Sequence, residues 1–316
     1  IPFYACYVNF EKCTWEFHFE LGVDDPAFVP YLEDRALAPT SSHPFMEILL
    51  RRESYIYLYS IVEQLRVKNV HIKAEASRLK DIELYNQLGP LDHSKPFELL
   101  GAIPKENSHF IFGHREAFSK PITELSVHMK WAKNPIMKGG FETYFKHYAN
   151  KKLGSSISSR PKTSEYVLAP TYLKNGGWRE MILNPPTIET FSLEKEGYST
   201  ATNIFGDELT FSMNEDELNP EIIQYENYKS YSQERTNGLV KMTLNCPDVA
   251  FGHDHYAQIL SETVMYNSRL KRREKPLQMP NAPFVPIIET VEMSYKAEGS
   301  AISPGSIGEN PNNINF

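Results

Sequence analysis

Alternation of apolar and polar residues, the pattern of a half-buried β-strand, recurs along this chain. Between residues 125 and 131, Leu125, Val127, Met129 and Trp131 alternate with polar side chains, which gives a period of two. The same alternation occurs at residues 15–21, 70–76, 209–213, 240–246 and 291–295. One apolar and one polar face is typical of antiparallel sheets with a solvated side. The pattern therefore predicts a β-rich α+β fold of antiparallel, β-sandwich-like modules with a few short packing helices.

Helical spacing is confined to a few segments. Phe141, Tyr144, Phe145 and Tyr148 recur at i, i+3, i+4 and i+7, which predicts a short amphipathic helix near residues 140–152. Leu58, Ile61, Val62 and Leu65 have the same spacing.

A longer helix is predicted near residues 254–274. Asp254 is a good N-cap, Ala257, Leu260 and Val264 would face inward, and Pro276 would stop the helix after a Lys/Arg-rich last turn.

Proline, glycine and serine divide the chain. We expect an N-terminal α/β layer over residues 1–88, a β-rich domain over 89–298 and a flexible linker or tail over 299–316, which is rich in Gly, Ser, Pro and Asn. The prolines at 276, 280, 283 and 286 predict a nearly rigid, extended segment, of which residues 280–286 would be a stiff connector to the next domain. The start at Ile1 without Met and the linker-like tail suggest a piece of a longer protein.

A hairpin turn is predicted at Asn175-Gly176.

Composition narrows the function only slightly. The chain has 316 residues and a net charge of −7, so it lacks the basic footprint of a nucleic-acid binder. The sequence contains no run of 18 apolar residues, so it predicts no membrane-spanning helix. Three cysteines without a C-x-x-C spacing indicate neither a disulfide framework nor a zinc site, and Cys246 is expected to behave as a small hydrophobe.

His253-Asp254-His255 is the most metal-like cluster. An H-x-H pair can hold zinc or iron together with a distant carboxylate. The cluster supports one possible function, that of a metal-dependent hydrolase, although no third ligand occurs at a recognisable spacing. His109 and His114 lack a nucleophile partner and are interpreted as structural. Neither a nucleophile elbow nor a phosphate-binding glycine loop occurs.

Aromatic residues indicate contacts with other molecules. Tyrosines recur at 55, 57 and 59 and again at 225, 228 and 231, and tyrosine is enriched in protein interfaces. A second alternative is a glycan-binding surface β protein that uses Trp15, Trp131 or Trp178. Because two of these tryptophans fall on the apolar face of predicted strands, core packing is the better interpretation.

Two stretches of the sequence resemble a known family. From Leu244 the chain reads LNCPDVAFGHDHYAQIL, and from residue 280 it reads PNAPFVPII. This region resembles the closing segment of large baseplate wedge proteins (baseplate J-like) of bacterial phage-tail-like contractile injection systems. A separate stretch, residues 86–97 with 112–113 and 125–131, also fits the family, and the resemblance covers roughly residues 55–298. The matching positions in the two stretches are Pro247, Asp248, Ala250, Phe251, Gly252, His253, Pro280, Asn281, Pro283, Pro286 and Ile288. Residues 155–231 have no counterpart.

The resemblance implies a structural, non-enzymatic virion or particle component. Such a protein links the hub and spike to the sheath and assembles around a sixfold axis. Its partners would be other wedge subunits, hub or spike proteins and sheath-proximal proteins, without nucleic acid, membrane insertion or cofactors. It would assemble in the bacterial cytoplasm as part of a phage-tail-like particle. No catalytic, cofactor-binding or metal residues are implied.

Overall fold

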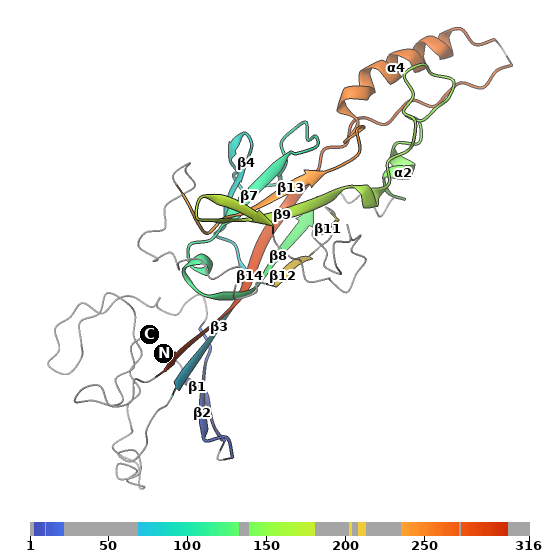
Figure 1. Ribbon diagram of the computed structural model, residues 1–316. Coiled ribbons are helices and arrows are strands. Elements are labelled where there is room, and N and C mark those ends of the chain that lie inside the picture. Colours follow the sequence, from blue (N-terminus) through green and yellow to red (C-terminus); the bar gives the residue numbers. More distant parts are fainter. Residues whose placement is uncertain are drawn as a thin grey trace, which may run out of the picture. The chain divides into compact units, whose positions relative to one another are not determined.

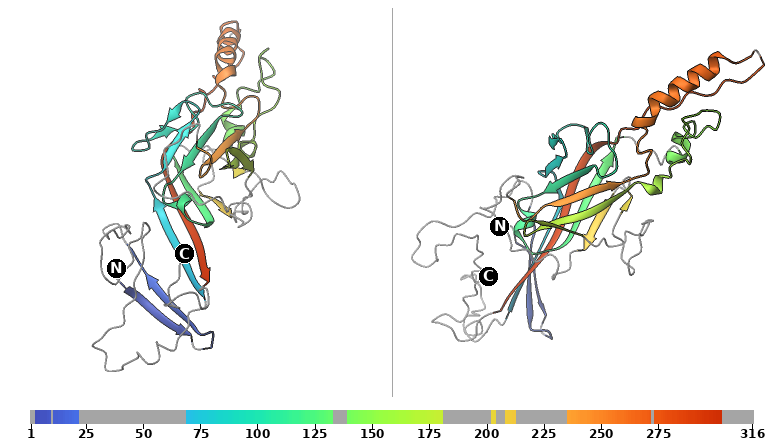
Figure 2. Two further views of the ribbon diagram at one scale, coloured as in Figure 1. Left: turned by 60° about the vertical axis from the view of Figure 1, so that its left-hand side comes forward. Right: turned by 45° about the horizontal axis from the view of Figure 1, so that its top comes forward.

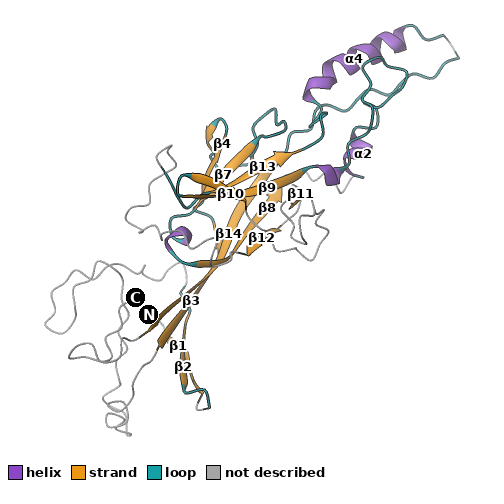
Figure 3. Ribbon diagram, in the orientation of Figure 1, coloured by secondary structure: helices purple, strands orange, loops and turns teal. Residues whose placement is uncertain are grey.

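The computed structural model describes residues 3–9, 11–21, 69–132, 139–180, 202–203, 208–212, 235–271 and 273–302. By their contacts, the residues form two units, 1–65 and 66–316. The predicted strands at 15–21, 70–76, 125–131, 240–246 and 291–295 are all present, and strands predominate over helices (Figure 3). The helix predicted around Leu58–Leu65 and the tyrosines at 55–59 and 225–231 lie outside the described residues.

The first unit contains a β-hairpin. Strand β1 (Phe3–Asn9) pairs with β2 (Thr14–Phe19) in antiparallel register, with Val8 opposite Trp15 and Tyr7 opposite Glu16. The predicted alternation at residues 15–21 is therefore a strand. The exposed fraction of Trp15 is 51% and that of Val8 is 44%, so the apolar face of the hairpin is largely open to solvent.

The second unit contains two antiparallel sheets (Figure 1). In the described residues the larger sheet has seven strands, in the order β10-β9-β13-β7-β4-β5, with β11 beside β9. Its strands are β4 (Glu83–Asn86), β5 (Gly89–Pro90), β7 (His109–Gly113), β9 (Val167–Lys174), β10 (Gly177–Glu180), β11 (Thr202–Asn203) and β13 (Val240–Asn245).

The smaller sheet has five described strands, in the order β12-β8-β14-β3, with β6 beside β14. They are β3 (Asn69–Leu79), β6 (Phe97–Glu98), β8 (Ile122–Trp131), β12 (Glu208–Ser212) and β14 (Ile287–Ile302). The long β14 pairs with β8 along its first part and with β3 along its last part.

One hydrophobic core joins the two sheets. Phe110 and Met242 from the larger sheet and Leu125 and Met293 from the smaller sheet belong to a single cluster of buried side chains. Burial of each large apolar side chain stabilises the fold by about 1.5–3 kcal/mol. Because both sheets contribute to this one core, they pack face to face. The prediction of a β-rich fold with antiparallel sheets is confirmed.

The helices are shorter than the sequence predicts. Helix α2 (Gly140–Tyr144) has little more than one turn, and turns replace the remainder of the helix predicted to residue 152. The predicted aromatic face is nevertheless buried, because Phe141, Phe145 and Tyr148 have no exposed surface. Single 3-10 turns occur at η1 (Ala117–Ser119) and η3 (Thr163–Glu165). Helix α4 (His253–Ser268) begins after Gly252 rather than at an Asp254 cap and ends before the basic residues.

The structure places the predicted domain boundary and the predicted tail as follows. Residues 88–101 lie inside the second unit, because β4 before them and β7 after them pair in one sheet. Residues 299–302 form the end of β14 and pair with β3, so that part of the predicted tail is strand. The rest of the tail lies outside the described residues.

The predicted turn at Asn175-Gly176 is confirmed. It joins β9 to β10, with Lys174 opposite Gly177. Both turn residues have positive φ, +51° and +76°, as a type I′ hairpin turn requires.

Candidate assembly site

A helix and its returning segment extend from the second unit. After α4 the chain turns and runs back beside the helix, as Figures 1 and 2 show. The amide of Asn267 holds this return, because its Nδ2 donates to the Leu277 carbonyl at 2.9 Å and its Oδ1 accepts from the Leu277 N–H at 2.8 Å. We call residues 253–280 the arm.

Aromatic side chains fix the base of the arm. The ring centroid of Phe141 lies 4.4 Å from that of Tyr166 and 5.2 Å from that of Phe284. Phe251 lies 5.0 Å from Tyr166 and stacks on Phe284 at 6.1 Å. We call these four residues the anchor cluster. Aromatic pairs at such distances contribute about 0.5–1.5 kcal/mol each beyond the area they bury, so the cluster joins four separate chain segments firmly.

Hydrogen bonds connect the same segments. The Tyr148 hydroxyl donates to the Asn281 carbonyl at 2.7 Å, and the Asn281 side-chain amide donates to the Tyr144 carbonyl at 2.7 Å. The Phe284 N–H donates to the Phe251 carbonyl at 2.9 Å. Burial raises the pKa of Tyr148 well above its usual value, so its hydroxyl remains a donor. The chain entering the arm and the chain leaving it are therefore held together at its base.

The residues of the family resemblance meet at this base. Pro247, Asp248, Phe251, Gly252 and His253 lead into α4, whereas Pro280, Asn281, Pro283 and Pro286 lead from the arm into β14. Phe251 and Asn281 make the contacts described above. The expected connector to another domain is wrong for 280–286, because this segment joins the arm to β14 within one unit.

Polar contacts support one side of the arm. The Glu262 carboxylate accepts a hydrogen bond from the Ser155 N–H at 3.0 Å, and this bond is the main cause of a lowered Glu262 pKa. Lys152 Nζ lies 5.5 Å from the centroid of the Tyr266 ring. The loop after α2 therefore runs along the arm and supports it. Neither Glu262 nor Asn267 is marked by a recognisable sequence pattern, because their side chains bond backbone groups, of Ser155 and Leu277 respectively.

The opposite side of α4 is exposed and almost uncharged. Ile259 and Thr263 are its buried residues, whereas Ala257 and Val264 are exposed. The prediction that Ala257, Leu260 and Val264 face the core is therefore wrong for Ala257 and Val264, whereas Leu260 is half-buried. The helical spacing is correct, but the packed face centres on Ile259 and Thr263. Val264 and Met265 are 48% and 49% exposed. Between His255 and Ser268 the only charged residue is Glu262, although solvent-facing helix surfaces normally carry charged residues.

The His253-Asp254-His255 cluster lies at the first turn of α4. Lys105 Nζ lies 2.9 Å from the Asp254 carboxylate, and its hydrogen bond lowers the Asp254 pKa. Within the described ranges, no group of three or more His, Cys, Asp or Glu side chains could hold a metal ion. His253 Nε2 is buried and has no hydrogen-bond partner.

Other candidate residues lie in the sheets or directly after a strand. Trp131 is buried in the core, as predicted, and Lys241 Nζ lies 4.4 Å above the half-buried Trp178 ring. Buried His114 accepts the Ala117 N–H at Nδ1, and half-buried His109 lies on β7. Burial raises the pKa of the Cys246 thiol to about 12, which makes it unreactive at neutral pH.

No family model and no curated protein sequence matches this chain. Among the helices of the described ranges, none is long and apolar enough to cross a membrane.

Proposed function

We propose that this protein is a structural wedge component of the baseplate of a phage-tail-like contractile injection system. In this role it links the hub and spike to the sheath and assembles around a sixfold axis with other wedge subunits. The observation that supports the proposal is the arm, an exposed and nearly uncharged helical face held at a fixed base. The residues that resemble wedge proteins, at 247–253 and 280–286, build that base.

The chemistry of the arm suits binding to another protein. Val264 and Met265 expose apolar surface on α4, and Met279 exposes more on the returning segment. Exposed apolar residues gathered on one element favour a protein contact over solvent. The anchor cluster and the two hydrogen bonds between the Asn267 side chain and Leu277 fix the arm before it binds, which lowers the entropy cost of association. Such a contact requires no catalytic group.

The test is purification of the tagged full chain from its native host, followed by identification of bound proteins and negative-stain electron microscopy. We expect sheath, tube and spike proteins, and sixfold plates in the images. A lone protein without these partners would refute the proposal.

A pair of variants tests the part played by the arm. Replacing Val264 and Met265 with Asp should remove the wedge partners from the purified complex. Leu88→Asp is the matched control, because Leu88 is also an exposed apolar residue, 79% exposed, but lies in the turn between β4 and β5. Equal recovery of partners with both variants would exclude the arm as the contact.

A further inference from the structure

Charge is distributed very unevenly along this chain. Residues 139–165 hold five basic and two acidic side chains, and the arm holds five basic and three acidic ones. These two segments therefore have a combined formal charge of +5. Since the chain has −7 in total, all its other residues together have −12. Much of the positive charge of the arm lies in its turn, where Arg269, Lys271, Arg273 and Lys275 are exposed.

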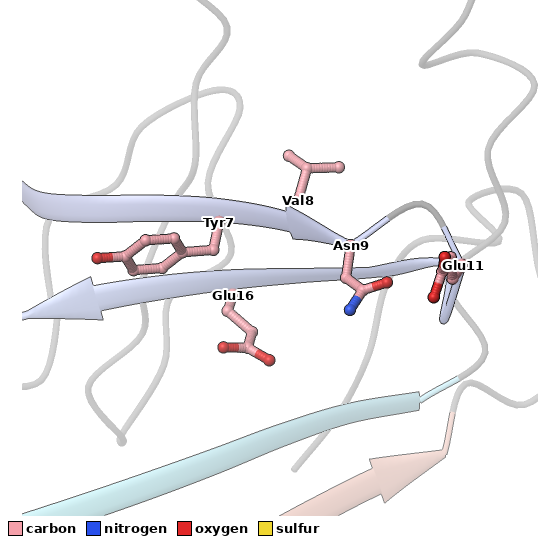
Figure 4. A pocket seen from close by; sticks show the side chains of 5 residues that line it. All are labelled: Tyr7, Val8, Asn9, Glu11 and Glu16. Atoms are coloured by element: carbon pink, nitrogen blue, oxygen red, sulfur yellow. The ribbon is translucent and has the colours of Figure 1, made fainter.

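The β1–β2 hairpin combines the complementary properties. Of its described charged residues, Glu11, Glu16 and Glu20 outnumber Lys12, and all four are exposed. Glu11 and Glu16 line a shallow hollow of about 550 Å³ with Tyr7, Val8 and Asn9 (Figure 4). The hairpin is thus acidic, and its Tyr7 and Trp15 side chains are more than half exposed, at 57% and 51%.

Exposed apolar residues concentrate on these two elements. The large apolar side chains exposed in the described ranges include Tyr7, Val8, Trp15, Phe19 and Leu21 around the hairpin, and Val264, Met265 and Met279 on the arm. The arm is apolar and basic, and the hairpin is apolar and acidic, so the charges of the two surfaces are complementary.

We propose that the arm of one copy binds the β1–β2 hairpin of a second copy. Val264 and Met265 would pack against Tyr7, on the hairpin face that also carries Glu16, and the basic turn of the arm would approach Glu16 and the turn residue Glu11. The inference rests on the proposed function, since it names the partner of the arm. Because each copy offers one arm and one hairpin, the contact is head-to-tail, and such contacts close into rings or extend into filaments.

Charge reversal on each surface of the full chain tests the contact. The arm variant is Arg273→Glu with Lys275→Glu, and the hairpin variant is Glu11→Lys with Glu20→Lys. Sedimentation velocity at low salt should show that the wild type self-associates and that each variant alone associates at least about tenfold more weakly. A control, Lys95→Glu with Arg179→Glu, reverses two exposed charges elsewhere and should associate like the wild type.

Mixing the two variants gives the decisive measurement. The mixture pairs each wild-type surface with its wild-type partner and each reversed surface with its reversed partner, so association should return. A monomeric wild type, a hairpin variant that associates normally, or a mixture that stays dissociated would each overturn the inference. A contact within one chain would give the first result, and an arm-to-arm contact would give the second.

The outcome can be separated from that of the proposed function. Wedge partners recovered from the host without self-association would leave the function standing and refute this contact. Self-association that follows the charge reversals, without tube or sheath proteins in the pull-down, would establish the contact and refute the baseplate role.

Discussion

At Gly252 the chain turns into α4 with a φ of +91°, a conformation that other residues rarely adopt. A Cβ at this position would lie 2.8 Å from the Phe145 ring and 3.2 Å from that of Tyr148. Both rings are completely buried, so they cannot move aside cheaply. The turn therefore depends on glycine for its backbone and for its space.

Gly252→Ala should destabilise the second unit by about 2–4 kcal/mol, from the backbone strain and the overpacking together. The control is Gly176→Ala. Its φ is +76°, but nothing lies within 4 Å of the added Cβ, so only the strain remains, about 1–2 kcal/mol. Urea unfolding measures both. Equal losses would show that the aromatic rings yield to the methyl group.

His114 should make stability fall as the pH falls below about 6.5. Burial is the main cause of its lowered pKa, against the opposing effects of Glu116 and Asp81. The unfolded chain therefore takes up a proton at a higher pH than the folded chain, so protonation favours unfolding. His114→Gln should flatten the dependence of the urea midpoint on pH between 7 and 5. An unchanged slope would contradict the prediction.

Glu116 acts in a separate, more acidic range. Burial would raise its pKa, but hydrogen bonds from Lys120 and Tyr295 outweigh that effect and lower it. The stability that it contributes is present above the pKa of the unfolded carboxyl and is lost as the pH falls through the lower folded value. It should therefore not obscure the His114 measurement.

Among the elements, the arm depends on few long-range contacts. The Asn267 side chain makes the two hydrogen bonds that hold Leu277 beside the helix end, and α4 buries only Ile259 and Thr263. Elements with few buried apolar contacts open locally before the whole fold does.

Asn267→Ala should release the returning segment while the sheets stay folded. The loss of two hydrogen bonds, each worth about 0.5–1.5 kcal/mol, should speed amide exchange about tenfold or more at Leu277 and its neighbours. Exchange in β13 should not change. Ser268→Ala is a suitable control, because the Ser268 hydroxyl donates to the Met265 carbonyl of its own helix. Similar exchange in both variants would show that the Asn267 hydrogen bonds do not hold the returning segment.

Much of the sheet structure could be predicted from the sequence. In β8 and β13 the apolar residues alternate and are buried, so local pattern and tertiary packing agree. For α4 the spacing predicted a helix correctly but not its packed face, because Ile259 and Thr263 pack inward while Val264 stays exposed. Periodicity shows which residues share a face and not which side the rest of the chain covers.

The base of the arm could be predicted only in part. The motif residues Phe251 and Asn281 were identified, but their meeting with Phe141 and Tyr148 depends on contacts over more than a hundred residues. In β2 the alternation also predicted a strand correctly, yet its apolar face is exposed. A strand pattern of this kind cannot distinguish a face that packs within the chain from one that another molecule covers.

For the whole molecule, the separation of charge makes association sensitive to salt. Raising the salt concentration from about 0.1 M to about 1 M shortens the screening length from about 10 Å to about 3 Å. Self-association of the full chain should weaken about tenfold over this range, as sedimentation velocity can measure. Unchanged or stronger association at high salt would indicate a contact that is apolar only, and would exclude the contribution of the basic turn.

The long strand β14 has a mechanical consequence. It begins at Ile287, directly after the segment that leaves the arm, and its far end pairs with β3, with Ala301 opposite Val70. A pull on the arm along the strand direction would load the ladders to β8 and β3 in shear, so that many hydrogen bonds would have to break together. The strand would then transmit a displacement of the arm to β3 with little extension of its own length.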